Sequence, residues 1–210
     1  MVDYIPVELL RKKLGELEQQ KKLSFDEIKK LRAEFPHSIQ LPEQSPQEMV
    51  DLPFINCAMY AFNLKSDDWY RAIADGPGII RKNPSRATEP DYSISADTEF
   101  VDYCINKRLV SAISGRELES GDLVVYSDID WCRHVGKLVQ HGRIRSKWGT
   151  IDLFEHELFE VPDIYGHKHQ YFEGLGSERA QQLFIRYAWS VVDDDPQIRI
   201  LLKSAINTYS

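Results

Sequence analysis

The apolar residues of this 210-residue chain follow two different periodicities, and their order along the sequence limits the folds that are possible. Residues 6–107 carry apolar positions mainly at helical spacing, whereas short strand-like runs separated by turns occupy residues 122–172. A helical pattern returns from Ser177 onward. Helices, then strands, then a helix is the order of an α+β domain with an antiparallel sheet, and it argues against an alternating α/β fold.

The N-terminal residues predict two helices joined by a very short turn. The first covers residues 6–22, and the second begins at Ser24, which forms a capping box with Glu27. Pro36 ends the second helix, because a proline ring clashes with the preceding helical turn. We therefore expect a helical hairpin that packs against the remainder of the chain.

The domain organisation follows from these patterns. We predict that residues 1–45 are a helical extension and that residues 46–210 are the main domain with its C-terminal helix. Helices of the main domain are expected at Asn56–Leu64, Ser66–Ala74 and Asp97–Lys107, and from Ser177 to an interruption at Pro196. Its strands are expected at Asp122–Ser127, Val135–Gln140 and Arg143–Trp148, with edge strands at Leu158–Val161 and His169–Phe172. A connector is expected over residues 37–53 and a surface loop over residues 76–92.

The net charge argues against two classes of partner. The chain carries a formal charge of −7 at neutral pH, and its pI is near 5.4. Because nucleic acids and anionic membranes attract positively charged proteins, neither is expected as the main partner. Arg143, Arg145 and Lys147 cluster locally, but a solvated strand face explains that cluster more simply than a phosphate site.

The cysteines and the N-terminus bear on the compartment. Three cysteines cannot all pair within one chain, and their spacing matches no disulfide framework, which favours a reducing compartment. The N-terminal residues are charged and amphipathic and lack the apolar core of a secretory signal. No run approaches the roughly 18 apolar residues of a membrane helix. We expect a cytoplasmic protein, with a dedicated secretion system as the route if it acts outside the cell.

Cys57 is the first candidate for chemistry. It stands at the expected start of a helix, directly after Pro53-Phe54-Ile55-Asn56. Unpaired N–H groups and the helix dipole at such a position favour a thiolate, which is the nucleophilic form of cysteine. The same N–H groups can stabilise an oxyanion on an attacked carbonyl. An inert core cysteine is the competing interpretation, because cysteine is among the residues most often buried.

His134 is the expected proton acceptor. It opens the strand-like run over residues 134–138, and a histidine at the start of a strand can face a neighbouring helix end. Gly136 follows two residues later and, lacking a side chain, allows another element to approach the strand closely.

A metal site is a competing use of the histidines. Cys132 and His134 are two residues apart, His167 and His169 repeat this spacing, and together the four side chains have the ligand types of a zinc site. Such a site would remove His134 as a base, and no Cys-x-x-Cys pair supports it. We therefore expect no metal and no cofactor.

Four segments in a fixed order carry a resemblance to a known family. They are Asn56-Cys57-Ala58, Ser-Gly-Asp-Leu-Val-Val-Tyr at 120–126, His134-Val135-Gly136, and Gly-Arg-Ile-Arg-Ser at 142–146. A cysteine at a helix start, a Gly-Asp-Leu-Val strand and a His-Val-Gly strand resemble the NlpC-type cysteine peptidases and amidases. The resemblance covers roughly residues 54–148, under half of the chain, and implies a papain-like core with the cysteine-bearing helix packed on an antiparallel sheet.

The resemblance also implies a third residue that orients the histidine. This position falls on Ser146, where relatives carry His, Asn or Gln. A serine hydroxyl can accept a hydrogen bond from the imidazole but adds no charge. Asp152, Glu155 and His156 are alternatives for the same role.

These residues together predict a cysteine-dependent hydrolase of amide or peptide bonds, with Cys57 as nucleophile, His134 as general base and Ser146 as the orienting group. The resemblance implies a peptide substrate, most commonly a cell-wall peptide that contains D-amino acids. If the chain is a delivered effector, an inhibitor or immunity protein is a candidate partner. The competing class is a binding module that retains the fold without turnover.

Overall fold

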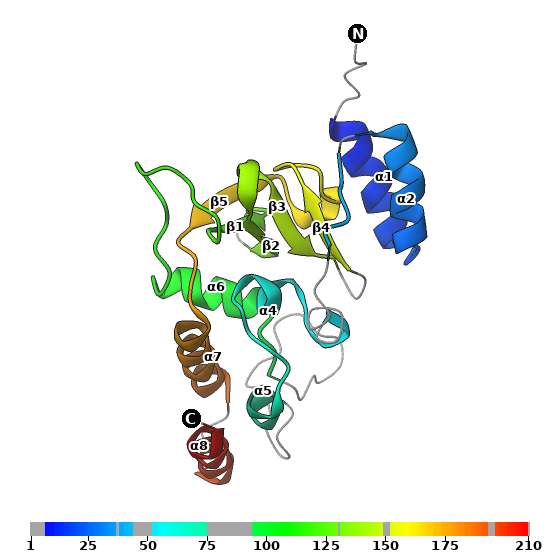
Figure 1. The fold of residues 1–210 in the computed structure, drawn as a ribbon. Helices are drawn as coiled ribbons and strands as arrows, with labels where there is room; N and C mark the ends of the chain where they lie inside the picture. Colours follow the sequence, from blue (N-terminus) through cyan, green and yellow to red (C-terminus); the bar gives the residue numbers. More distant parts are fainter. Residues whose placement is uncertain are drawn as a thin grey trace.

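The fold is that of a computed structural model, which describes residues 7–36, 38–43, 52–74, 94–129, 131–148, 152–192 and 196–209. In these residues the chain forms seven α-helices and one five-stranded antiparallel sheet, with helices on both faces of the sheet (Figure 1). This arrangement confirms the predicted α+β class. The loop expected over 76–92 lies outside the described residues, and so does most of the connector expected over 37–53.

The predicted N-terminal hairpin is present. It consists of α1 (Val7–Gln19) and α2 (Phe25–Glu34), which lie side by side at one edge of the molecule in Figure 1. Ser24 caps α2, because its side-chain oxygen accepts a hydrogen bond from the N–H of Glu27 at 3.4 Å. The capping signal read from the sequence therefore marks the true start of the helix.

One buried arginine joins the hairpin to the rest of the molecule. Arg11 on α1 is 7% exposed, and its guanidinium donates to the main-chain oxygens of Phe159 at 3.2 Å and Gly166 at 2.7 Å. The hairpin is thus attached to the segment that follows the fourth strand. It shares a core with the sheet, although the predicted boundary at residue 45 stays a prediction.

Three further described α-helices lie between the hairpin and the sheet in the sequence. They are α4 (Cys57–Ala61), α5 (Asp68–Ala74) and α6 (Thr98–Asn106). The helix expected to reach Leu64 ends earlier, because Asn63 takes a left-handed conformation with φ of 55° and the N–H of Leu64 bonds back to the oxygen of Met59 at 2.9 Å. This is a helix-terminating geometry, and it leaves α4 with only five residues.

The sheet has the order β4-β3-β2-β1-β5. Its strands are β1 (Leu123–Ser127), β2 (Cys132–Leu138), β3 (Ile144–Lys147), β4 (Leu153–His156) and β5 (Lys168–Phe172). The three expected central strands and the last edge strand are confirmed within a few residues. The edge strand expected at Leu158–Val161 is wrong, since the edge position is taken by β4 a few residues earlier.

The two faces of the sheet bury two separate cores. Val124 and Tyr126 point toward the hairpin, where they pack with Leu10, Leu14 and other apolar residues. Their neighbours on β1 point the opposite way, toward α4, α6 and α7. Successive side chains of a strand alternate between faces, so this division follows from the pleat.

The C-terminal helices cover the second core. They are α7 (Ser177–Val191) and α8 (Pro196–Tyr209), and the predicted interruption at Pro196 is confirmed as the start of α8. Phe184 on α7 meets the ring of Phe100 edge to face at 5.9 Å and stacks on Tyr70 at 4.7 Å. These rings connect α5, α6 and α7 into one layer.

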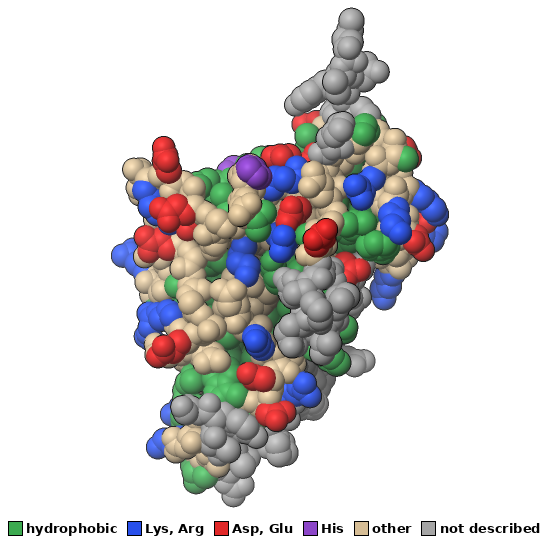
Figure 2. Space-filling model, viewed as in Figure 1, with side chains coloured by type: hydrophobic (Ala, Val, Ile, Leu, Met, Phe, Trp, Pro, Cys, Tyr) green, Lys and Arg blue, Asp and Glu red, His purple; other side chains and the backbone are tan. Residues whose placement is uncertain are grey.

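No helix in the described part of the chain is long and apolar enough to cross a membrane. On the face shown in Figure 2, acidic and basic side chains are interspersed and do not gather into one large patch of a single sign.

The contribution of the hairpin core is testable with two leucines of α1. Leu14 is completely buried and Leu9 is 45% exposed. Leu14→Ala should lower the free energy of unfolding by about 2–5 kcal/mol, because it leaves a cavity between hairpin and sheet. Leu9→Ala removes the same atoms from the surface and should change the free energy of unfolding by roughly 0.5 kcal/mol or less. Urea denaturation measures both, and equal effects would contradict the packing described above.

The close approach of β3 to β2 is testable at Gly136. A Cβ atom at this position would lie 2.8 Å from Cγ2 of Ile144 and 2.9 Å from Cβ of Ser146. Gly136→Ala should therefore destabilise the protein by about 1–3 kcal/mol through overpacking. Gly176→Ala is the matched control, since no heavy atom lies within 4 Å of the added Cβ. A Gly136→Ala variant as stable as this control would show that the strands separate without cost.

Candidate functional site

Cys57 lies at the start of α4, where that short helix meets the sheet. It is half-buried, and α4 packs on β2 and β3. The N-terminal capping position is filled by Asn56, whose side-chain oxygen accepts from the N–H of Met59 at 2.9 Å. With five residues, α4 has too few peptide units to build the full dipole on which the sequence argument relied. The expected activation of Cys57 by a helix end is therefore not provided.

The environment of the thiol favours its neutral form. Burial raises the pKa of Cys57 to about 11, although hydrogen bonds from the backbone of Val135 and Ala58 act to lower it. The nearby carboxylate of Asp97 raises the pKa further. The thiolate that the sequence led us to expect is thus a minor species at neutral pH, because desolvation outweighs the two backbone donors.

His134 lies on the opposite face of the sheet from α4. Its ring stacks on Tyr165 with centroids 4.1 Å apart and lies 5.9 Å from the ring of Tyr126, and both tyrosines belong to the core under the hairpin. The next residue, Val135, points into the other core together with residues of α4. From the sequence, we expect Cys57 and His134 to be in contact. The structure does not bring the two side chains together, since the sheet separates them.

Burial also sets the protonation state of His134. The ring is 2% exposed, and its Nε2 atom has no hydrogen-bond partner among the described residues. Burial, together with the nearby His156, lowers the pKa of His134 well below its usual value. A neutral imidazole held against an aromatic ring is an arrangement that serves packing.

The zinc site considered above does not form. Between Ser127 and Tyr126 on β1 the pairing with β2 shifts register, from Cys132 to His134. This bulge places Cys132 in the core that contains Val135, whereas His134 points to the other face. Among the described residues no group of three His, Cys, Asp or Glu side chains is placed to hold a metal ion.

Ser146 belongs to a closed hydrogen-bond chain on the hairpin side. Its hydroxyl oxygen lies 2.8 Å from Nε2 of His156 and accepts from Nε1 of Trp148 at 2.9 Å. Nδ1 of His156 faces the carbonyl oxygen of Glu157 at 2.8 Å, so Nδ1 carries the proton and Nε2 accepts from the Ser146 hydroxyl. Ser146 therefore orients His156 and not His134, which corrects the role assigned to it from the sequence.

The two remaining alternatives lie away from His134. Glu155 precedes His156 on β4 and points to the face that carries Cys57, where its carboxylate accepts from Nε of Arg145 at 2.9 Å. The charge of Asp152 acts on the ammonium of Lys147. Neither carboxylate orients His134, and His156 is committed to Ser146 and Glu157.

Lys147 is the residue that the sequence analysis overlooked. Because Ser146 points toward the hairpin, its neighbour on β3 points toward α4. Lys147 is 0% exposed, and its charge interacts with Cys57. The signal was available in the alternation along β3, since assigning Ser146 to one face places Lys147 on the other. It was missed because Lys147 was grouped with Arg143 and Arg145 as a solvated strand face.

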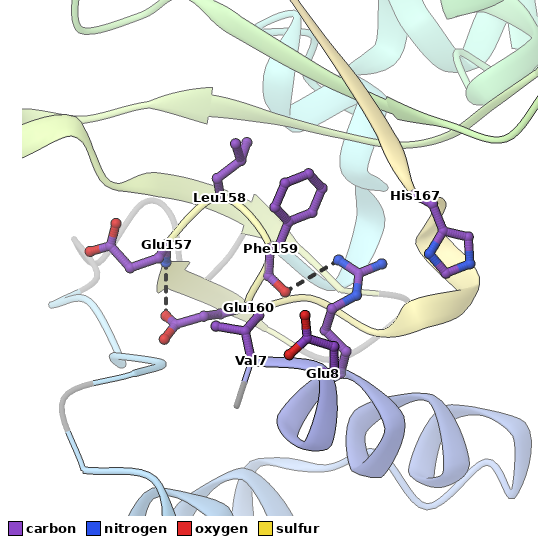
Figure 3. Close-up of a pocket in the computed structure, with 8 residues that line it drawn as sticks. Val7, Glu8, Glu157, Leu158, Phe159, Glu160 and His167 are labelled. Atoms are coloured by element: carbon purple, nitrogen blue, oxygen red, sulfur yellow. Dashed lines mark hydrogen bonds between the residues drawn. The ribbon is translucent and has the colours of Figure 1, made fainter. Parts of the chain in front are cut away.

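The cavity drawn in Figure 3 is separate from Cys57. It has a volume of about 430 Å³ and lies between α1 and the segment after β4. Its lining residues are Val7, Glu8, Arg11, Glu157, Leu158, Phe159, Glu160 and His167. Its best-fixed polar groups serve local structure: Arg11 bonds to the main-chain oxygen of Phe159, and Glu160 accepts from the N–H of Glu157 at 2.9 Å. None of the residues predicted for catalysis lines it.

No family model, curated protein or solved structure matches this chain.

The two buried histidines predict sensitivity to acid. Burial lowers the pKa of His156 to about 4 and the pKa of His134 well below its usual value, so the folded state binds fewer protons than the unfolded chain. Their contribution to stability is full above about pH 6.5, the unfolded value, and falls as the pH drops toward 4. Each should cost about 2 kcal/mol of unfolding free energy between pH 7 and pH 5.

His134→Phe isolates this effect, because phenylalanine keeps an aromatic ring against Tyr165 and does not titrate. Urea denaturation at pH 7 and pH 5 should show a smaller loss in His134→Phe than in the parent chain, by about 2 kcal/mol. An identical pH dependence in the two proteins would mean that His134 is solvated or already charged in the folded state.

Proposed function

We propose that this chain is a cysteine-dependent hydrolase of amide or peptide bonds, with Cys57 as the nucleophile, on a papain-like plan of the NlpC type. One observation carries the proposal. The partly buried Cys57 lies where a helix meets an antiparallel sheet, and backbone groups of Val135 and Ala58 hydrogen-bond to its sulfur. The antiparallel sheet, in which β1, β2 and β3 are neighbours, supports the proposal at the level of fold class.

The chemistry follows from these contacts. A thiol held against backbone donors can attack a carbonyl carbon, and the donors that contact sulfur are placed to stabilise negative charge that develops on the carbonyl oxygen. Because burial raises the pKa of Cys57 to about 11, the proton must be removed at the moment of attack by a neighbouring base. His134 is not that base in this arrangement, since it lies on the other face of the sheet.

The substrate class rests on the resemblance alone. It implies a peptide or peptidoglycan-like amide, with cell-wall peptides containing D-amino acids as the commonest case. A protein delivered to another cell would also have an inhibitor or immunity protein as its partner.

A binding module without turnover is the second candidate, and the raised pKa of Cys57 favours it. In a binding module, Cys57 would stay protonated. His134 would serve only packing, because it is buried and stacks on Tyr165. The two functions differ in one property, which is covalent chemistry at Cys57.

The proposal is tested with 4-nitrophenyl acetate, an activated ester that acylates nucleophilic thiols without requiring the natural substrate. At pH 7.5 the parent chain should release nitrophenol in an initial burst and carry one acetyl group on Cys57 by peptide mass spectrometry. Cys57→Ala should lose the burst entirely, while the buried thiols of Cys104 and Cys132 stay unmodified. His134→Phe should keep the burst.

Two outcomes would decide against the hydrolase. A parent chain without a burst, or with a burst that persists in Cys57→Ala, would leave the binding module as the better description. A burst lost in both Cys57→Ala and His134→Phe would restore the predicted cysteine–histidine pair and would require a conformation in which the two side chains meet.

A further inference from the structure

We propose that Lys147 is the general base and general acid of the Cys57 site. The inference rests on the proposed hydrolase function and names the group that accepts and returns the proton of the Cys57 thiol. In this arrangement the lysine occupies the role that the sequence argument assigned to His134.

The placement of Lys147 follows from the strands. Ser146 points toward the hairpin, because its hydroxyl bonds with His156 and Trp148. Lys147 therefore points to the opposite face, onto which α4 packs through β2 and β3. Arg145 has the same orientation and pairs there with Glu155. Cys57 and Lys147 thus face the same layer between helix and sheet.

The burial of Lys147 calls for an explanation. Lysine is almost never fully buried unless it is paired, and Lys147 is 0% exposed. Its charge interacts with those of Asp152 and Cys57. Asp152 directly precedes β4, and its main-chain oxygen accepts from the N–H of Trp148 at 3.2 Å. The carboxylate of Asp152 and the thiol of Cys57 are thus two titratable neighbours of this ammonium.

The electrostatics suit proton exchange between the two groups. Burial lowers the pKa of Lys147 below its usual 10.5, while the charges of Asp152 and Cys57 act to raise it. Burial raises the pKa of Cys57 to about 11. Desolvation thus makes the thiol a weaker acid and the ammonium a stronger one, so both groups are biased toward their neutral forms. A desolvated lysine is a known way to obtain an amine base near neutral pH.

The steps balance with these two side chains and water. The neutral amine of Lys147 takes the proton from Sγ of Cys57, the sulfur bonds to the carbonyl carbon, and the carbonyl π electrons move to oxygen. When the tetrahedral carbon collapses, the C–N bond breaks and the leaving nitrogen takes the proton from Lys147. Water then attacks the thioester while Lys147 accepts its proton. The C–S bond breaks, and the proton returns from Lys147 to sulfur, leaving a carboxylic acid and an amine as products.

A purely electrostatic or structural role for Lys147 is the alternative, and two substitutions separate it from the proposal. Lys147→Arg keeps a positive charge on a long side chain but cannot release a proton near neutral pH. Lys147→Met keeps the apolar stem and removes both the charge and the base. His134→Phe is the matched control on the other face of the sheet.

The experiment follows steady-state hydrolysis of 4-nitrophenyl acetate at pH 7.5, since turnover after the burst needs a base to activate water. Both Lys147 variants should lose roughly 100-fold in steady-state rate, the usual scale of general acid–base catalysis, and His134→Phe should lose none. A Lys147→Arg variant that turns over like the parent would overturn the inference, because charge alone would then suffice.

Failure of the inference is distinguishable from failure of the function. A Cys57-dependent burst with steady-state turnover that is unchanged in Lys147→Met retains the hydrolase and removes Lys147 from it. If circular dichroism shows that neither Lys147 variant folds, the pH profile of Cys57 alkylation by iodoacetamide in the parent decides. A profile with two titration steps supports a proton shared between Cys57 and a neighbouring amine, whereas a single step, as for an isolated thiol, overturns the inference.

Discussion

The pleat of β2 is the constraint on which the remaining structure depends. It sends His134 toward the hairpin and Val135 toward α4, so that neighbouring residues belong to different cores. The central strands are covered on both faces. A shift of one residue in register would therefore move every side chain of a strand to the opposite face, where it would no longer fit the core. The same alternation along β3 separates Ser146 from Lys147. Chemistry in this molecule is therefore decided by which face a side chain occupies and not by its distance along the sequence.

Desolvation acts on both faces and in one direction. It raises the pKa of Cys57, lowers the pKa of His134 and lowers the pKa of Lys147, and in each case it acts against the charged form. Local donors such as the backbone of Val135 oppose this effect for the thiol but do not overcome it. A site of this kind holds no permanent thiolate–imidazolium pair. The proposed hydrolase would therefore need to transfer the thiol proton during the reaction itself.

Local signals predicted much of the fold. Ser24 and Pro36 bracket α2 because capping and proline geometry act within a few residues, and Gly136 marks a close strand contact because only glycine fits there. The site was harder to predict. The bulge between Ser127 and Tyr126 changes the face on which Cys132 lies, and no residue in this segment predicts the bulge. The extent of burial at Cys57 depends on packing between segments that are distant in the sequence. The spacing of apolar residues does not predict such packing.

The attachment of the hairpin has a consequence for sequence variation. Arg11 reaches across to the main-chain oxygens of Phe159 and Gly166, and every residue type offers such an oxygen. The recognition therefore depends on the path of the backbone and is indifferent to the side chains that the segment displays. Substitutions in that segment can accumulate while α1 and α2 stay attached, provided that the backbone keeps the same path. A change at Arg11 itself has no such freedom, because a single guanidinium serves both carbonyl groups.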